Sequence, residues 1–191
     1  EHFPCIILAV PAGIATTALY YAVNKVIRHS RGYLWSSFWH SFKTNMKQGA
    51  FVTLVVAAAV VLVGLDGYIM YQFAKAGEKS GVLYVVFFVL MLVVIAWAIY
   101  VFPYMARFEN STKLILKNSA LMAIGNLPKT FMALMFFLAC CIGTYLLPVV
   151  AIISPALGML LLNYILEGVF ERYMSDEDRE AENERNQEFY N

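Results

Sequence analysis

Few residues in this chain have the type and setting to do chemistry, and the first is a carboxylate inside apolar sequence. Asp66 is the only formal charge between Ala50 and Phe73. An ionised carboxylate at the middle of a bilayer costs about 2.5–3.5 kcal/mol, so such a group normally faces protein or water. Asp66 could contact a solute or a cation in an outward-facing cavity, with Tyr68 and Tyr20 as further lining residues. The alternative is a hydrogen bond to a neighbouring helix.

Charged groups also stand where two apolar stretches end. Glu167, Glu171 and Arg172 follow the last stretch, and Arg107 and Glu109 follow an earlier one. Ion pairs at exposed helix ends stay solvated and add little stability. We expect solvated, ion-paired helix ends at both places. For Glu167 the alternative is a contact with a partner protein.

Other chemistries lack the residues that they need. The chain has no Gly-rich loop with a phosphate-binding Lys, so we do not expect it to hydrolyse ATP. Its three histidines are scattered, and its apolar stretches offer one carboxylate where intramembrane aspartyl proteolysis needs two. Cys5, Cys140 and Cys141 lie in apolar surroundings, which favours buried thiols over a disulfide. We predict no enzyme activity, no metal site, no cofactor and no nucleic-acid partner.

The composition places these residues in a membrane protein. Hydrophobic residues make up 61% of the chain and charged residues 14%, whereas soluble domains average about 45–50% and about 25%. A helix needs about 20 predominantly apolar residues to cross the hydrocarbon layer. We therefore predict an all-α, polytopic helical membrane domain over residues 1–174, followed by an acidic cytoplasmic tail over residues 175–191.

The apolar pattern predicts five complete crossings and part of another. A partial helix at residues 3–10 is expected to end in a tight turn at Pro11-Ala12-Gly13, because proline removes a backbone donor and glycine tolerates unusual backbone angles. The complete crossings are expected at residues 14–27, 50–73, 81–105, 130–147 and 149–170. We expect that missing N-terminal sequence completes the first helix, which gives six crossings in the intact chain.

The distribution of lysine and arginine predicts the orientation. Five of these residues lie in the connection 24–49 and four in the connection 107–129, but only two lie in residues 75–80. Because cytoplasmic loops are enriched in Lys and Arg, we expect both long connections and the C-terminus in the cytoplasm. The chain is then a multi-pass protein with the lipid bilayer as its first partner.

Both long connections contain an amphipathic segment. In residues 33–48, apolar side chains share one helical face and polar side chains the other, and residues 111–126 repeat this pattern more weakly. Such helices lie in the membrane interface or against another protein. The predicted contact residues are Trp35, Phe38, Trp39, Phe42, Lys43, Lys47, Lys113 and Lys117. Each segment precedes a crossing and a return crossing, so the chain contains two coarse repeats.

Five short segments together suggest a family. They are Pro11–Gly13, Thr16–Tyr21, Ser37–Gln48, Leu65–Tyr68 and Asn163–Phe170. The most specific is Phe-x-x-x-Phe-Lys-x-Asn-x-Lys-Gln, which begins at Phe38. The set resembles the YesL family of bacterial integral membrane proteins, and the resemblance extends to about Tyr173. Members of that family are commonly encoded beside the permeases and solute-binding proteins of carbohydrate ABC importers, and the family has no agreed catalytic residues.

The resemblance implies an accessory integral-membrane subunit of a carbohydrate importer in the bacterial inner membrane. Its partners would be the ABC permease subunits and, indirectly, a solute-binding protein and an ATPase. The chain itself does not resemble a permease, because Ala120–Pro128 lacks the acidic start of the permease coupling segment and is too short. The alternatives are an autonomous small-molecule transporter that uses Asp66, or a scaffold or sensor whose acidic tail recruits a cytoplasmic protein.

Overall fold

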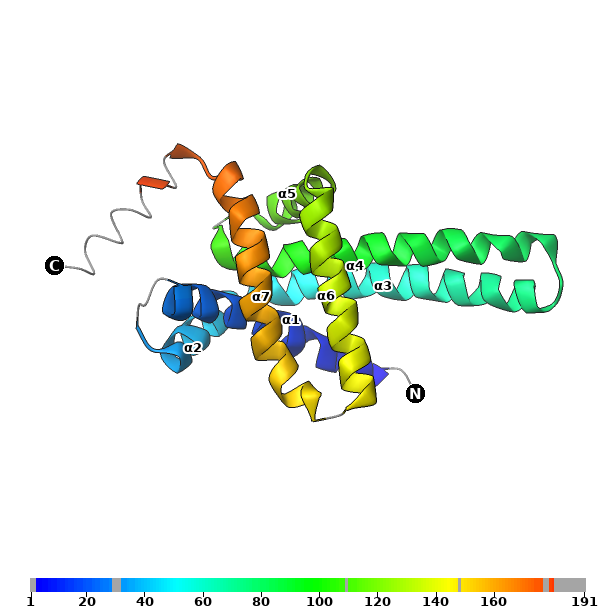
Figure 1. Cartoon of the computed structure of the whole chain (residues 1–191), viewed down its shortest axis with the longest axis horizontal. Coiled ribbons are helices and arrows are strands. Elements are labelled where there is room, and N and C mark those ends of the chain that lie inside the picture. The colour runs from blue at the N-terminus through cyan, green and yellow to red at the C-terminus, as the bar shows by residue number, and fades with distance from the viewer. Residues whose placement is uncertain (1–2, 29–31, 109, 148, 177–178, 181–191) are drawn as a thin grey trace.

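The computed structural model of this chain is built from helices and short connections (Figure 1). It describes residues 3–28, 32–108, 110–147, 149–176 and 179–180, and this part of the chain contains no strand. The helices, with η1 a π-helical and η2 a 3₁₀ segment, are α1 (Phe3–Val23), η1 (Asn24–Arg28), α2 (Leu34–Thr44), α3 (Met46–Lys75), η2 (Lys79–Leu83), α4 (Tyr84–Arg107), α5 (Thr112–Gly125), α6 (Leu127–Leu146) and α7 (Val150–Tyr173). The all-α fold class predicted from the sequence is confirmed.

Four helical segments in the described part are long and apolar enough to cross a membrane. They are Met46–Lys75, Lys79–Arg107, Leu127–Leu146 and Ile153–Tyr173. They coincide with four of the predicted crossings. Only 11% to 33% of the most apolar window of each is buried within the chain, so most of their apolar surface is directed outward. These four segments indicate a multi-pass membrane protein.

Two helical hairpins and α1 make up the body of the molecule. Figure 1 shows α3 and α4 as an antiparallel pair whose far half projects beyond every other element, and α6 and α7 lying steeply across its near half. Helix α1 packs against α3, α4 and α7. The short helix α2 packs on α1, and α5 packs on α4, so each short helix lies on the long helix that precedes it. The order of elements matches the two predicted repeats, α2–α3–α4 and α5–α6–α7.

Glycines make the close contacts of the α3–α4 hairpin possible. A Cβ placed on Gly64 would lie 3.3 Å from Met91, and one on Gly67 would lie 3.3 Å from Phe87. At the turn, a Cβ on Gly81 would overlap the backbone of Ala74, so the chain can close here only without a side chain. Gly77 has a φ of 79° with no atom near a placed Cβ, which is a left-handed position in open space.

The prediction of a turn at Pro11-Ala12-Gly13 is wrong, because α1 is continuous from Phe3 to Val23. Pro11 is exposed, and membrane helices tolerate proline when neighbouring groups satisfy the freed backbone. Gly13 is buried where α1 meets α3, and a Cβ placed there would overlap the hydroxyl of Thr53. The glycine therefore serves helix packing rather than a turn. The predicted partial helix and first crossing are one element, so the described part has five long helices where five crossings and a separate partial helix were predicted.

The predicted amphipathic segment 33–48 is divided at Asn45. Helix α2 ends at Thr44 and α3 begins at Met46, so Lys47 belongs to the first turn of α3. The Asn45 amide donates a hydrogen bond of 3.0 Å to the Ser41 carbonyl, which satisfies an acceptor at the end of α2. The second predicted segment, 111–126, agrees closely with α5.

Some predictions concern residues that the structure does not describe. The acidic tail 175–191 lies mostly outside the described residues, and so do Glu109 and the side chain of Cys5. The division into domains at residue 174 stays a prediction.

Candidate functional site

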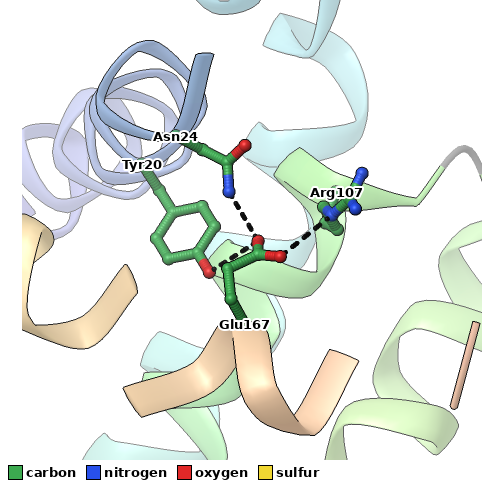
Figure 2. Close-up of polar contacts among 4 residues, drawn as sticks. All are labelled: Tyr20, Asn24, Arg107 and Glu167. Atoms are coloured by element: carbon green, nitrogen blue, oxygen red, sulfur yellow. Dashed lines mark hydrogen bonds and ion pairs between the residues drawn. The ribbon is translucent and has the colours of Figure 1, made fainter. Parts of the chain in front are cut away.

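Glu167 is the one buried charged residue in the described part of the chain, with its side chain 1% exposed. Figure 2 shows three groups directed at its carboxylate. The Asn24 amide donates a hydrogen bond of 2.6 Å to Oε1, and the Tyr20 hydroxyl donates one of 3.3 Å to the same oxygen. The Nε of Arg107 lies 3.4 Å from Oε2 as an ion pair. We call these four residues the Glu167 cluster.

Three long helices bring the Glu167 cluster together. Tyr20 and Asn24 are four residues apart, so they share one face at the end of α1 and in η1. Arg107 is the last residue of α4, and Glu167 lies within α7. Each of these helices supplies a polar group to the same small volume.

Aromatic packing holds α7 in the position that the cluster needs. Phe170 lies three residues after Glu167 and is fully buried. Its ring makes edge contacts with the rings of Tyr20, Tyr104 and Phe108, at centroid distances of 6.4, 6.2 and 5.8 Å. Such pairs add about 0.5–1.5 kcal/mol each beyond the burial of their area. Phe170 therefore fixes α7 against α1 and the end of α4.

The Glu167 cluster satisfies a buried charge instead of presenting it to a solute. A carboxylate without water needs hydrogen-bond donors and an opposite charge, because burial removes its hydration. Asn24, Tyr20 and Arg107 supply both. Removing one partner of a buried ion pair typically costs about 3–5 kcal/mol, since the other charge is left uncompensated. The arrangement fastens α1, α4 and α7 to one another.

The position of the cluster agrees with alternating crossings. If α1, α3, α4, α6 and α7 cross in alternate directions, the C-terminal ends of α1, α4 and α7 lie on the same face of the membrane. The cluster joins the end of α1, the last residue of α4 and the C-terminal third of α7. The side of the membrane on which these ends lie stays a prediction.

The prediction of a solvated helix end at Glu167 is wrong. The sequence shows Glu167 near the end of an apolar stretch, but the end of α1 and the end of α4 cover it. Because Glu167 is buried within the chain, its side chain is not available for the predicted contact with a partner protein. The signal in the sequence was the four-residue spacing of Tyr20 and Asn24, which could have suggested two donors on one face.

Asn163 is a second buried polar group on α7, one turn before Glu167. It is 2% exposed, and its Nδ2 has no hydrogen-bond partner among the described residues. A buried donor without a partner costs about 1–3 kcal/mol. Asn163 and Glu167 therefore share a helix face but differ in how well their polar atoms are satisfied.

A second set of hydrogen bonds fastens α5. The Trp97 indole on α4 donates to the Leu116 carbonyl at 3.2 Å and to the Ser119 hydroxyl at 3.1 Å. The Asn126 amide donates to the Tyr173 hydroxyl at 3.2 Å. These bonds connect the basic connection 107–129 to both α4 and the end of α7.

The three predicted solute-facing residues do not come together. Asp66 and Tyr68 are exposed on the projecting part of α3, whereas Tyr20 is buried in the Glu167 cluster. No hydrogen bond to Asp66 is found among the described residues, so the predicted bond to a neighbouring helix is not seen either. A shallow apolar groove between α3 and α4 is lined by other residues, namely Val63, Gly64, Gly67, Tyr71, Tyr84, Phe87, Phe88 and Met91. Solute contact at Asp66 stays a prediction.

The predicted interfacial residues lie mostly on the surface. Trp35 is 68% exposed and Trp39 is 40% exposed, and Phe38 and Phe42 are half-buried. The side chains of four lysines are exposed, namely Lys43, Lys47, Lys113 and Lys117. The face that α2 buries consists of Ser37 and Ser41. The aromatic side of α2 is therefore the outward side.

The cysteines give no site in the described part of the chain. Cys140 is half-buried, and Cys141 is exposed on α6 as a free thiol. The prediction of buried thiols is wrong for Cys141, because α6 turns much of its apolar surface away from the body. No three His, Cys, Asp or Glu side chains gather as a metal ion requires, within the residues described.

The fold and the site define a multi-pass helical membrane protein in which three long helices are joined around the buried carboxylate of Glu167. Residues 4–67 match the family model described as "Protein of unknown function, DUF624". This segment contains most of α1, all of α2 and most of α3. Over residues 4–67 the match confirms the predicted resemblance, because the YesL family is a DUF624 family. The comparisons with curated proteins and with solved structures give no match.

Proposed function

We propose that this chain is an accessory integral-membrane subunit of a carbohydrate ABC importer and packs against the permease subunits. The resemblance to the YesL family supplies this class of partner, because members of the family are commonly encoded beside such permeases. The role needs neither a catalytic residue nor a cofactor in this chain.

The setting of Asp66 is the observation that carries the proposal. This carboxylate lies within a candidate membrane span, is exposed, and has no hydrogen-bond partner in the described part of the chain. An ionised Asp66 side chain that faced lipid would cost about 2.5–3.5 kcal/mol on insertion scales. A donor from a neighbouring subunit would remove that cost.

The shape of the molecule leaves room for such a neighbour. The far half of the α3–α4 hairpin packs against no other element in Figure 1. In its two helices, only 22% and 11% of the most apolar window is buried. Membrane helices associate through close packing and hydrogen bonds between helices, and this hairpin offers a long apolar surface with one carboxylate in it.

Affinity purification at native expression level tests the proposal. We expect the tagged chain, extracted in a mild detergent, to retain permease and ATPase subunits that mass spectrometry identifies. The variant Asp66→Leu is expected to lose most of the permease while its own yield and helicity stay unchanged. Glu78→Gln, which neutralises an exposed carboxylate at the end of the same hairpin, is the matched control and should retain the permease.

Two outcomes would contradict the proposal. The first is recovery of the wild-type chain alone from mild detergent. The second is movement of a solute by the purified chain in proteoliposomes without ATP or other subunits. The second outcome would favour the autonomous transporter, and loss of that flux in Asp66→Asn would then assign Asp66 to the solute.

A further inference from the structure

The outward side of α2 is a continuous aromatic surface. Trp35 stacks on Phe38 at a centroid distance of 6.1 Å, and Phe38 stacks on Phe42 at 6.0 Å. Trp39 contacts all three rings by its edge or face, at 5.7, 5.8 and 5.5 Å. We call Trp35, Phe38, Trp39 and Phe42 the aromatic face of α2. Its four rings support one another and do not enter the core of the molecule.

The opposite side of α2 explains why the rings point outward. Ser37 is 5% exposed and Ser41 is 2% exposed, and these small side chains let α2 lie close on α1. An amphipathic helix on a soluble protein would bury its aromatic side. This helix instead buries its serines and offers the aromatic rings to its surroundings.

The length of α2 sets its relation to the bilayer. Its 11 residues extend about 16 Å at 1.5 Å per residue, which is about half of the hydrocarbon thickness. Helix α2 therefore cannot cross. It lies between the long helices α1 and α3 in the chain, and tryptophan is enriched at the headgroup level.

Along the chain, the formal charges on both sides of α2 are all positive. No acidic residue occurs between Glu1 and Asp66, whereas Lys43 and Lys47 are exposed at the end of α2 and the start of α3. Lys25 also lies near the start of α2. The Cε atom of Lys25 would be 3.9 Å from a Cβ placed on Gly32, which is two residues before α2 begins. Clusters of basic residues beside a membrane helix attract anionic headgroups.

We infer that the aromatic face of α2, together with Lys43 and Lys47, is a binding surface for anionic phospholipid. The rings enter the headgroup layer, and the two ammonium groups lie against lipid phosphates. A protein partner would instead have to cover four adjacent rings and bring acidic groups of its own to pair with Lys43 and Lys47. The inference does not depend on the proposed importer role.

A lipid titration tests the two lysines. The purified full chain in neutral detergent is titrated with phosphatidylglycerol, and its thermal unfolding midpoint is followed, with phosphatidylcholine as the uncharged comparison. We expect phosphatidylglycerol alone to stabilise the wild type, and the double variant Lys43→Gln/Lys47→Gln to need about 30-fold more of it. The control Lys75→Gln/Lys79→Gln, at the other end of α3, should behave as the wild type. Equal stabilisation of all three proteins, or equal stabilisation by both lipids, would overturn the inference.

Fluorescence quenching tests the aromatic face independently. The chain is placed in bilayer discs that contain lipids brominated near the glycerol, and the quenched emission is compared with that of Trp35→Phe/Trp39→Phe. We expect the quenched component to be strong in the wild type and largely absent in the variant, which keeps Trp97. If the α2 component were quenched by acrylamide in water and not by brominated lipid, the aromatic face would be a surface for a protein and not for lipid.

Discussion

Arg107 and Glu167 form an ion pair inside the protein, with Nε and Oε2 3.4 Å apart. The two residues belong to different hairpins, since Arg107 ends α4 and Glu167 lies on α7. Asn24 and Tyr20 complete the surroundings of the carboxylate from α1 and η1. The ion pair is a polar connection between α4 and α7, which also meet through the rings of Tyr104 and Phe170.

Neutralising Glu167 should destabilise the protein strongly. In Glu167→Gln the Arg107 guanidinium loses its opposite charge inside the protein, which typically costs about 3–5 kcal/mol. We expect a clear fall in the thermal unfolding midpoint in detergent, measured by circular dichroism. Asp66→Asn is the matched control, because it neutralises an exposed carboxylate in a membrane helix and should leave the midpoint nearly unchanged.

A double-mutant cycle separates the ion pair from simple loss of volume. Arg107→Gln alone should destabilise as Glu167→Gln does, and the double variant should cost much less than the sum of the two. Additive effects of the two substitutions would show that Arg107 and Glu167 do not interact in the folded protein.

Asn24 and Asn163 should respond differently to the same substitution. Asn24→Leu removes the hydrogen bond of 2.6 Å to Glu167 and should cost about 1–3 kcal/mol, since the carboxylate is left with fewer donors. Asn163→Leu removes an amide nitrogen without a partner in the described part and should be neutral or stabilising. Chemical unfolding of both variants in detergent measures the difference. A larger loss for Asn163→Leu than for Asn24→Leu would contradict the assignment of partners.

A methyl group at Gly13 should separate α1 from α3. The added Cβ would overlap the Thr53 hydroxyl and lie 2.8 Å from the Phe102 ring, so the helices must move apart. We expect Gly13→Ala to lower the unfolding midpoint by several degrees. Gly158→Ala is the control, because its Cβ would be 4.0 Å from its nearest neighbour, Phe136. Equal midpoints for the two variants would mean that Gly13 is not at a close helix contact.

The turn of the α3–α4 hairpin should tolerate a side chain at one glycine and not at the other. Gly81→Ala would place a Cβ on the backbone of Ala74, so the turn must open. Gly77→Asn keeps a residue that accepts the left-handed φ of 79° and meets open space. We expect trypsin to cleave at Lys75 and Lys79 faster in Gly81→Ala than in the wild type, and at the wild-type rate in Gly77→Asn. Unchanged cleavage of Gly81→Ala would contradict this geometry.

The two ends of α3 should lie on opposite faces of the membrane. In a variant without the native cysteines, we expect Glu78→Cys to react with an impermeant maleimide on intact cells. Lys43→Cys and Lys117→Cys should react only after the cells are opened, because they lie within the basic connections. Labelling of position 43 or 117 from outside would reverse the orientation or overturn the predicted topology.

The long crossings could be predicted from the sequence because their signal is local. A run of about 20 apolar residues fixes a membrane helix with little help from the rest of the chain. The prediction failed at Gly13, because glycine after proline indicates a turn as well as it indicates a close helix contact. Only the position of Thr53, on another helix, distinguishes the two.

The Glu167 cluster could not be predicted for the same reason. The sequence places Glu167 near the end of an apolar stretch, where most carboxylates are solvated. Its burial depends on Asn24 and Arg107, which are distant in the chain and are brought near by the packing of three helices. Likewise, the amphipathic pattern of α2 was visible, but the pattern does not say which side faces α1. The burial of Ser37 and Ser41 decides that question.

The projecting tip of the α3–α4 hairpin is a suitable position for inserting a fusion partner into this protein of only 21.5 kDa. Gly77 lies in the turn between α3 and η2, with no atom within 4 Å of a placed Cβ. The tip of the hairpin lies far from α7 in Figure 1. Exposed loop tips accept inserted sequence more readily than any other position. A rigid fusion partner or an epitope for an antibody fragment grafted there would add mass for image alignment in electron cryomicroscopy, and it would leave the polar junction of α1, α4 and α7 untouched.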